Sequence, residues 1–558
     1  MTRTRRRDVL GMALALASGA LAGNGALAAS GCAPRGPRRV PDGELLDPGM
    51  ALGHRVRDAG VPRATPPPAD APILDVVIAG GGVAGLAAAW RLRARGIDSF
   101  ELCELADVEG GTARSGASAL TAYPWGAHYV TTPLADDTLM TGLLHEVGAL
   151  EGVDEHGHPR AAEAFACREP DERLFVADEA TGGGRFLEGL APVELLDDLD
   201  RRDFARFEAL LDDYAALIDG AGRHAFALPR AQSSTDAALL ALDRLSFRDW
   251  LLAHGLVSQR LHWLCDYAMR DDDGVSLEQA SAWAGLFYFC ARRRPGVAER
   301  SVITRPDGNG FLVRHLAKAS AGRRVCHEAV VDVRPAGDVV DVVTMDLAGT
   351  LRTRRARHVI VAVPRFVAAR IVQPLRERPP PWLSHFTNSA WVVANVHLSG
   401  RPRVVAGVPF AWDTVIEDSE SLGFIDASHQ SGRDHGPTVW TWYRPLLDND
   451  GRSGRAALYA GDRAHWADAC LTDLERAFPE VRGLATRVDV CRWGHAMIRP
   501  IVGLFSSGAL AAAALPVGND NIHFAHTDLS GMALCEEALF HGARAADDVM
   551  ARLSGLVR

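Results

Sequence analysis

Lysine is almost absent from this chain of 558 residues, since Lys318 is the only lysine among 60 basic residues. Arginine therefore carries every other fixed positive charge, and Lys318 is the only residue that could serve as a catalytic lysine. The formal net charge is -10, and no long basic block lies beyond the N-terminus. These features argue against binding to a phosphate backbone, so no nucleic-acid partner is expected.

Paired cysteines and clustered metal ligands are also lacking. The nine cysteines lie singly between Cys32 and Cys535, without a CxxC pair or the spacing of a disulfide framework. Buried free thiols are the simplest interpretation, and one disulfide in an oxidising compartment is the alternative. His156 and His158 have no further candidate ligands beside them in the sequence, so no metal site is predicted.

Beyond its N-terminal end, the chain has no apolar run of the ~18 residues that a membrane-spanning helix needs. Residues 6–10 (RRDVL) precede a run rich in Ala, Gly and Leu, an order that resembles a twin-arginine signal. We expect residues 1–31 to be a signal peptide that directs the folded protein through the twin-arginine export machinery to the periplasm or cell envelope. Cleavage after residues 26–28 and lipid attachment at Cys32, as in a lipoprotein, are both consistent with the pattern.

A glycine-rich turn follows the first apolar strand-like segment. Residues 73–79 (ILDVVIA) are apolar and β-branched, and they lead directly into residues 80–85 (GGGVAG) and a helical stretch. The first glycine permits a tight turn, the next lets the backbone approach a pyrophosphate, and the last lets the helix pack on the strand. The pyrophosphate is expected at the helix N-terminus. The predicted dinucleotide-binding turn comprises Gly80, Gly82, Val83, Ala84 and Gly85.

A carboxylate follows at the spacing that a dinucleotide site requires. Residues 98–105 (DSFELCEL) predict a second strand, and Glu104 lies about 20 residues past the turn. Glu104 is therefore the expected acceptor of ribose hydroxyl hydrogen bonds, with Glu101 as a neighbouring alternative. The cofactor is expected to contain an ADP moiety.

Two further motifs narrow the choice of dinucleotide. Residues 110–114 (GGTAR) carry a glycine pair and an arginine, and residues 521–525 (NIHFA) predict a strand before a long amphipathic helix. With the glycine turn, these motifs resemble the FAD-dependent superfamily of amine oxidases, protoporphyrinogen oxidases and phytoene desaturases. The resemblance covers most of residues 73–550 and implies FAD as cofactor. Many members place the arginine directly after the glycine pair, whereas here it is displaced to Arg114.

The resemblance implies FAD contacts spread along the chain. A glycine loop folds against the pyrophosphate, an arginine neutralises it, and a valine touches the adenine. Asp528 is the implied ribitol or pyrophosphate contact, with a plain helix-capping aspartate as the alternative. Met532 lies where the N-terminus of a helix faces the flavin. The implied contacts are Gly110, Gly111, Arg114, Gly126, Ala127, Val330, Asp528, Gly531 and Met532.

The same motifs predict how the chain divides. The expected fold is a discontinuous α/β FAD-binding Rossmann-like domain with an α+β substrate domain. The Pro- and Arg-rich residues 32–72 are expected to be a linker. The FAD-binding domain is expected at residues 73–134, 304–365 and 488–558, and the substrate domain at residues 135–303 and 366–487.

Two histidines are the catalytic candidates. His128 lies in a segment expected beside the flavin, and an unperturbed histidine titrates near neutral pH. His495 lies before the closing strand and helix, and ordinary packing is the alternative for both residues. Amine oxidases of the superfamily typically hold a lysine near flavin N5, but Lys318 is expected on the surface and residues 388–398 have none. This favours a desaturase or dehydrogenase over an amine oxidase that forms peroxide.

The expected activity is FAD-dependent oxidation of a C–N or C–C bond in a small or lipid-like organic substrate, by hydride transfer to flavin N5. No second GxGxxG motif follows a strand, so electrons are expected to pass to oxygen or a quinone. Two alternatives stay open. A NAD-dependent Rossmann dehydrogenase would need only the glycine turn, and an exported flavin-fold binding protein would keep the cofactor motifs without catalysis.

Overall fold

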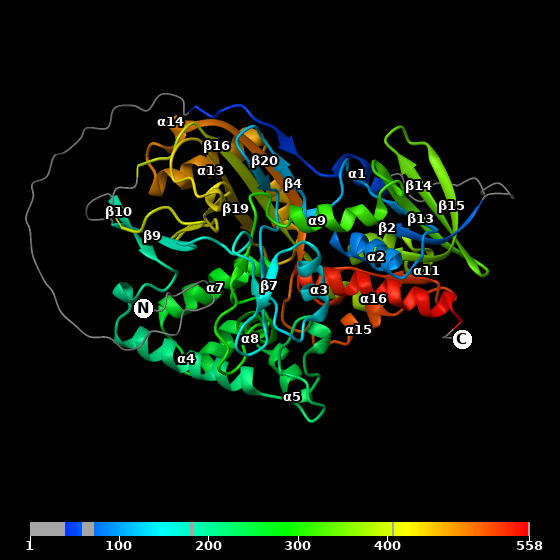
Figure 1. The fold of residues 1–558 in the computed structure, drawn as a ribbon, viewed down its shortest axis with the longest axis horizontal. Coiled ribbons are helices and arrows are strands. Elements are labelled where there is room, and N and C mark those ends of the chain that lie inside the picture. The colour runs from blue at the N-terminus through cyan, green and yellow to red at the C-terminus, as the bar shows by residue number, and fades with distance from the viewer. Residues whose placement is uncertain (1–38, 59–71, 179–182, 404–406, 556–558) are drawn as a thin grey trace, which may run out of the picture.

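The computed structural model describes residues 39–58, 72–178, 183–403 and 407–555, which form two domains around two large sheets (Figure 1). The expected signal peptide and Cys32 lie outside these ranges. Within the described ranges, no helix combines the length and apolar composition that crossing a bilayer requires.

The first domain is built on a seven-stranded sheet. Its strands are β2 (Ile73–Ala79), β3 (Phe100–Cys103), β12 (Arg324–Val325), β13 (Glu328–Ala336), β14 (Val339–Asp346), β15 (Leu351–Val361) and β21 (Ile522–Phe524). The order is β12-β3-β2-β15-β14-β13, and β21 also pairs with β15. The ladders among β12, β3, β2, β15 and β21 are parallel, whereas β13, β14 and β15 pair antiparallel. The apolar, β-branched β2 lies in the middle of this sheet, where its last four residues are fully buried.

Helices from opposite ends of the chain pack together beside this sheet. Helices α2 (Val83–Ala94) and α16 (Cys535–Leu553) lie side by side (Figure 1). Small residues allow the close approach, because a Cβ atom at Gly542 would lie only 2.2 Å from the Ala84 carbonyl oxygen. The C-terminal segment is thereby fixed against the N-terminal glycine turn.

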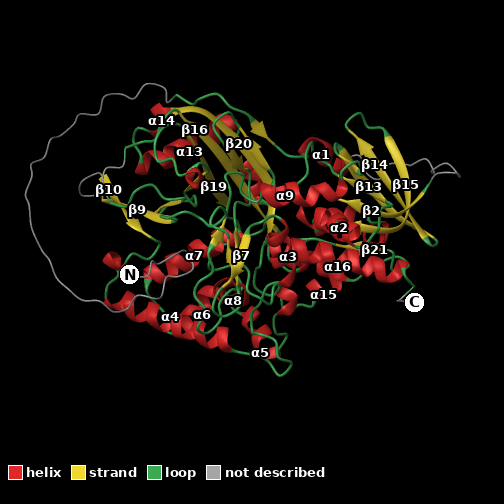
Figure 2. Cartoon of the chain, in the orientation of Figure 1, coloured by secondary structure: helices red, strands yellow, loops and turns green. Residues whose placement is uncertain are grey.

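The second domain combines an eight-stranded sheet with a group of helices (Figure 2). The sheet order is β1 (Leu45–Leu46), β20 (Ala485–Ile498), β16 (Asn388–Leu398), β19 (Thr438–Leu446), β18 (Phe424–Asp426), β17 (Asp413–Ile416), β9 (Glu172–Asp178) and β10 (Gly183–Glu188). The helices include α4 (Asp198–Ala216), α5 (Ala237–Leu240), α6 (Phe247–Ala253), α7 (Gln259–Asp273) and α8 (Ala282–Cys290). Helix α8 is apolar on every side and fully buried, as expected for a central core helix.

The structure corrects two expected domain boundaries. Residues 39–58 are part of the fold rather than of a linker, because they contain β1 and α1 (Met50–Asp58). The expected boundary at residue 488 falls inside β20. That strand pairs along most of its length with β16, so all of β20 belongs to the eight-stranded sheet of the substrate domain.

Candidate active site

A large cavity lies between the two domains, at the carboxyl ends of β2 and β3. Its volume is about 1170 Å³. Pockets for one small molecule commonly measure about 300 to 1,000 Å³, so this cavity has room for a dinucleotide together with a substrate. The carboxyl ends of parallel strands are the usual ligand position in doubly wound sheets.

The glycine turn forms a cradle on one side of the cavity. Gly80 has a φ of +105°, and a Cβ there would lie 2.5 Å from the Ala362 carbonyl oxygen. A Cβ at Gly85 would lie 1.9 Å from the Gly80 carbonyl oxygen, so only glycine fits either position. Gly82 borders the cavity and a Cβ there would meet nothing within 4 Å. Since α2 begins at Val83, open space lies at a helix N-terminus, which suits a pyrophosphate.

A second glycine loop packs against this cradle. Gly110 and Gly111 have φ angles of +114° and +56°. The Gly110 N–H donates to the Gly81 carbonyl oxygen at 2.8 Å, and a Cβ at Gly111 would lie 3.3 Å from the Gly82 Cα. Both glycines of the pair border the cavity. The absence of side chains therefore brings two stretches of backbone together where the pyrophosphate is expected.

Glu104 borders the cavity just after β3. Its carboxylate accepts hydrogen bonds from the backbone N–H groups of Gly81 at 2.6 Å and Ala106 at 2.7 Å. Burial raises the pKa of this carboxyl, and these two donors oppose the rise. The carboxylate is thus held in one orientation and keeps lone pairs for ribose hydroxyls. Glu101 does not border the cavity and instead forms an ion pair with Arg354.

The remaining expected contacts that border the cavity come from three elements. Gly126 approaches another loop closely, because a Cβ there would lie 2.2 Å from the Thr112 carbonyl oxygen. Val330 lies on β13 near Glu104, because the N–H of Glu328, the first residue of β13, donates to the Glu104 carbonyl oxygen at 2.9 Å. These cavity residues are Val83, Ala84, Gly126, Ala127 and Val330.

The structure corrects the expected role of Arg114. Its side chain is buried, pairs with Asp107 at 3.0 Å and does not border the cavity. The short turn after the glycine pair instead presents Thr112 and Ala113 to the cavity. The arginine charge is therefore paired with the Asp107 carboxylate, and the N-terminus of α2 is left to attract the phosphates.

Asp528 also has a different role from the expected cofactor contact. Its side chain is 1% exposed and does not border the cavity. One carboxylate oxygen accepts the backbone N–H of Arg365 at 2.7 Å, at the first residue of α10 (Arg365–Ile371). Asp528 is thus a helix-capping aspartate, although the helix it caps is not the following one. Its neighbours His526 and Thr527 border the cavity in its place.

The expected flavin-facing residues at the C-terminal helix are displaced. Gly531 and Met532 do not border the cavity, and Met532 is 1% exposed in the core. Helix α16 begins at Cys535, and residues 533–535 border the cavity at its N-terminus. The next residue, Glu536, pairs with Arg292 at 2.7 Å. The helix N-terminus therefore faces the cavity as expected, but through residues that follow the predicted ones.

His128 borders the cavity within an aromatic cluster. Its ring centroid lies 5.1 Å from Tyr129, 5.5 Å from Trp412 and 4.8 Å from Tyr443. Its Nδ1 lies 3.3 Å from the Gly126 carbonyl oxygen, which also accepts the Tyr443 hydroxyl at 3.0 Å. The cluster is thus anchored to the loop expected beside the flavin.

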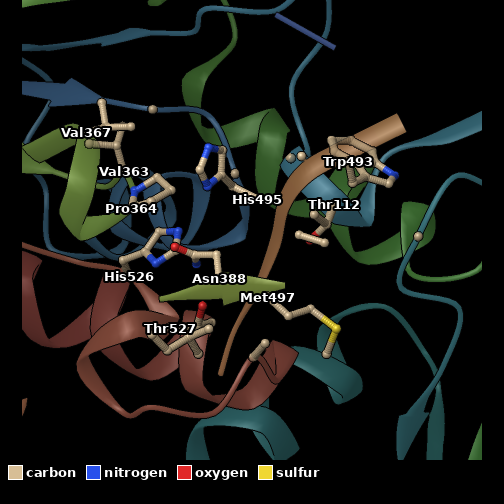
Figure 3. Close-up of a pocket in the computed structure, with 18 of the residues that line it drawn as sticks. Thr112, Val363, Pro364, Val367, Asn388, Trp493, His495, Met497, His526 and Thr527 are labelled. Carbon is tan, nitrogen blue, oxygen red and sulfur yellow. The ribbon is translucent and has the colours of Figure 1, made fainter. Parts of the chain in front are cut away.

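His495 borders the cavity on β20 (Figure 3). Its ring stacks on Phe366 with centroids 4.0 Å apart, and the Arg455 guanidinium donates to its Nδ1 at 3.2 Å. Burial among these groups and then the Arg455 charge lower its pKa to about 4. The imidazole is therefore neutral near neutral pH, with its Nδ1 acting as an acceptor.

A His495→Asn variant is expected to keep the pH dependence of flavin reduction above about pH 5, because a group with a lowered pKa of this size is already deprotonated there. The asparagine side chain can still accept a hydrogen bond from Arg455. Rates of substrate-dependent flavin reduction, measured from pH 5 to 9 for both proteins, check this. A near-neutral limb that is present in the parent and absent from the variant would contradict it.

Several cavity residues carry no motif that could have identified them. Asp271 and Asp272 come from the last turn of α7, and the Tyr129 hydroxyl donates to Asp272 at 3.2 Å. Figure 3 shows other residues that line the same cavity. These residues include Val363, Pro364, Asn388, Trp493, Met497, His526 and Thr527.

Comparisons with known proteins identify relatives of this fold. The family model described as flavin containing amine oxidoreductase matches residues 83–550. Putrescine oxidase, solved with putrescine bound, matches with a TM-score of 0.62 and 19% identity, over 86% of this chain and 100% of that one. Cyclohexylamine oxidase from Brevibacterium oxydans IH-35A gives 0.60 and 18%, over 87% and 100%. A fatty acid isomerase from P. acnes gives 0.58 and 14%, over 84% and 97%. No curated protein sequence gives a significant match.

The cradle and the comparisons lead to the same cofactor. Open space at Gly82, the N-terminus of α2 and the fixed carboxylate of Glu104 fit the ADP half of a flavin dinucleotide. The predicted Rossmann-like domain with a second, substrate domain is confirmed, and the protein is an FAD-dependent oxidoreductase. This replaces the alternatives of a NAD-dependent dehydrogenase and a binding protein without catalysis. Because the family model matches most of its length, the chain belongs to the flavin-containing amine oxidoreductase family.

Proposed function

We propose that this enzyme oxidises a C–N bond of a small organic amine, in place of the desaturase or dehydrogenase that the missing lysine favours. The observation that carries the proposal is the pair of carboxylates, Asp271 and Asp272, on the cavity wall. An alkylamine is positively charged near neutral pH, as lysine is with its pKa of about 10.4. Two carboxylates facing the cavity would attract and orient such a cation.

The surroundings of these carboxylates strengthen their negative potential. They lie in the last turn of α7, where the helix dipole is also negative. The neighbouring Arg270 donates to the carbonyl oxygens of Ser419 and Glu420 and lies 3.9 Å from the Asp266 carboxylate, which balances its charge. Burial, followed by repulsion from Asp272 and Asp271, raises the pKa of Asp273 well above its usual range.

Aromatic rings stand on the same wall. Tyr129 connects the carboxylates to the aromatic cluster around His128. Its hydroxyl donates to Asp272, and its ring contacts His128. Tyr443 also borders the cavity. Aromatic faces attract cations as well as apolar chains, so carboxylates and rings together suit an ammonium group carried on a carbon skeleton.

Bound FAD supplies the acceptor for a hydride from the carbon next to nitrogen. The bound ammonium loses that hydride and one N–H proton, which passes to solvent, so an iminium with a C=N bond forms and gives the imine when it loses a second proton. Water then hydrolyses the released imine to a carbonyl compound and an amine or ammonia. The chain orients the substrate through Asp271 and Asp272 on the cavity wall. We propose oxygen as the electron acceptor, with a quinone as the competing outcome, because putrescine oxidase and cyclohexylamine oxidase share this fold.

The test is anaerobic mixing of the holoenzyme with monoamines, diamines, fatty acids and polyenes. Amines are expected to bleach the visible flavin absorbance, and the other compounds to leave it unchanged. Reoxidation is then followed after adding oxygen or a soluble quinone. Bleaching by a fatty acid or polyene without any response to amines would overturn the proposal in favour of C–C oxidation.

The only lysine is expected to have no part in this reaction. Lys318 is exposed at the end of α9 (Gly310–Ala317) and does not border the cavity. A Lys318→Ala variant should therefore keep its rates of flavin reduction and reoxidation within about twofold, as exposed substitutions far from a site usually do. Stopped-flow absorbance measures both rates. A large loss of either rate would mean that this lysine acts on the flavin.

A further inference from the structure

The segment that precedes the glycine turn is attached to both domains. Its β1 adds an edge strand to the substrate sheet in parallel with β20, with Leu45 opposite Val490 and Leu46 opposite Cys491. The Glu44 N–H also donates to the Asp489 carboxylate at 2.7 Å. These bonds fix the first end of the segment to the second domain.

The other end of the segment rests on the FAD-binding domain. Helix α1 places Leu52, which is 2% exposed, in a small apolar cluster with residues of the seven-stranded sheet. The cluster consists of Leu52, Ala329, Val331, Val343 and Met345. Figure 1 shows the segment passing from β20 to α1 beside β13. It therefore bridges the two domains instead of connecting them loosely.

From Asp47 into α1, the segment also forms part of the cavity wall. Gly49 has a φ of +69°, and a Cβ there would lie 2.6 Å from the side chain of Leu105. Leu105 follows Glu104, so the start of α1 lies beside the carboxylate expected at the ribose. The residues of the segment that border the cavity are Asp47, Pro48, Gly49, Met50, Gly53, His54, Val56 and Arg57.

We propose that residues 47–57 are a clasp that forms the outer wall of the FAD site and retains FAD by closing the adenosine end of the cavity. The clasp lies near Glu104 and Val330, so it covers the nucleotide half of the cofactor. FAD can leave through the adenosine end of the cavity only after residues 47–57 have moved away from β20 and from the FAD-binding domain. The rate of FAD release is therefore governed by the attachments of the clasp.

One ion pair is the main polar attachment of the clasp. Both carboxylate oxygens of Asp47 accept from the Arg492 guanidinium, at 2.8 and 2.6 Å. Arg492 is buried on β20, donates to the Gly461 carbonyl oxygen at 2.9 Å and lies over the Tyr459 ring. Since Asp47 lies between β1 and α1, this pair holds the clasp at its bend.

An engineered disulfide between the clasp and the FAD-binding domain tests the proposal, because it can be formed and then reduced in the same protein. A Cβ at Gly49 would lie 3.8 Å from the Leu105 Cβ, and disulfides have a Cβ separation of about 3.8 Å. In a Gly49→Cys/Leu105→Cys variant loaded with FAD, oxidation is expected to slow FAD release at least about tenfold, and dithiothreitol to restore it. Release is followed by the fluorescence of free FAD after dilution. The strain of a cysteine at a positive φ is present in both forms and cancels in the comparison. Equal release rates in the two forms would overturn the proposal.

Removing the polar attachment gives an independent result. An Asp47→Asn variant is expected to release FAD about tenfold faster than the parent, because Arg492 loses its charged partner. Its matched control is Asp341→Asn, which removes a two-bond pair with Arg355 away from the cavity. Release from Asp47→Asn at the rate of this control would also overturn the proposal. Neither experiment uses a substrate, so both are independent of the proposed amine oxidation.

Discussion

A Gly82→Asp variant is expected to fold normally and to purify without FAD. Gly82 has extended backbone angles, φ -69° and ψ 179°, which any residue can adopt. A Cβ there would meet no atom of the protein within 4 Å, so the new side chain enters the cavity without straining the chain. In the cavity, its carboxylate would occupy the space expected for the pyrophosphate and repel the phosphates.

The flavin-to-protein absorbance ratio and titration of the FAD-free protein with FAD measure this effect. We expect affinity to fall at least about 100-fold, because a helix-terminus phosphate contact is lost and a like charge is added. Gly142→Asp is the matched control, since Gly142 is exposed in α3 (Thr138–Glu146) and a Cβ there also meets nothing. A normal flavin content in Gly82→Asp would show that the cradle does not hold the cofactor.

An Asp271→Asn/Asp272→Asn double variant is expected to retain FAD and lose most of its reaction with amines. Both changes preserve side-chain size and remove the charge that would attract the ammonium group. We expect the second-order rate constant for flavin reduction to fall about 100-fold or more, since truncating one partner of a buried charge pair commonly costs 2–5 kcal/mol.

Anaerobic stopped-flow reduction by the best amine found in the substrate panel measures the loss. Reduction by dithionite is the internal control, because it does not depend on the acidic wall. Asp213→Asn is the matched variant, since Asp213 is an exposed aspartate on α4 that does not border the cavity. If the double variant reacts with amines at the parent rate, the carboxylates do not recognise the substrate and the proposed function loses its main support.

The most accurate sequence predictions concern positions that lie close together along the chain. The strand, glycine turn and helix at residues 73–94 are in the predicted order, and Gly80, Gly82 and Gly85 form the turn. Glu104 follows at the predicted spacing and borders the same cavity. Such motifs can be read directly because backbone geometry and hydrogen bonding within a few residues determine their shape.

Arg114 and Asp528 show where this reasoning fails. Both residue types suit a cofactor contact, but Asp107 neutralises the first and the second caps α10, which begins at Arg365. The partner of Asp528 lies 163 positions away in the sequence. Composition gives no signal for such a partnership, because it depends on how separate elements pack.

Local patterns were enough to predict the glycine turn and its helix, and the resemblance carried by these motifs implied FAD and the fold, because short motifs have a backbone shape that depends on neighbouring residues. Which side chains border the cavity depends instead on how distant segments pack together. The expected linker becomes part of the fold because the Glu44 backbone N–H donates to the Asp489 carboxylate, 445 positions away. Tertiary packing also brings Asp271 and Asp272 to the cavity wall. The physical reason is that burial and facing direction are set by packing between distant segments, which no local pattern records.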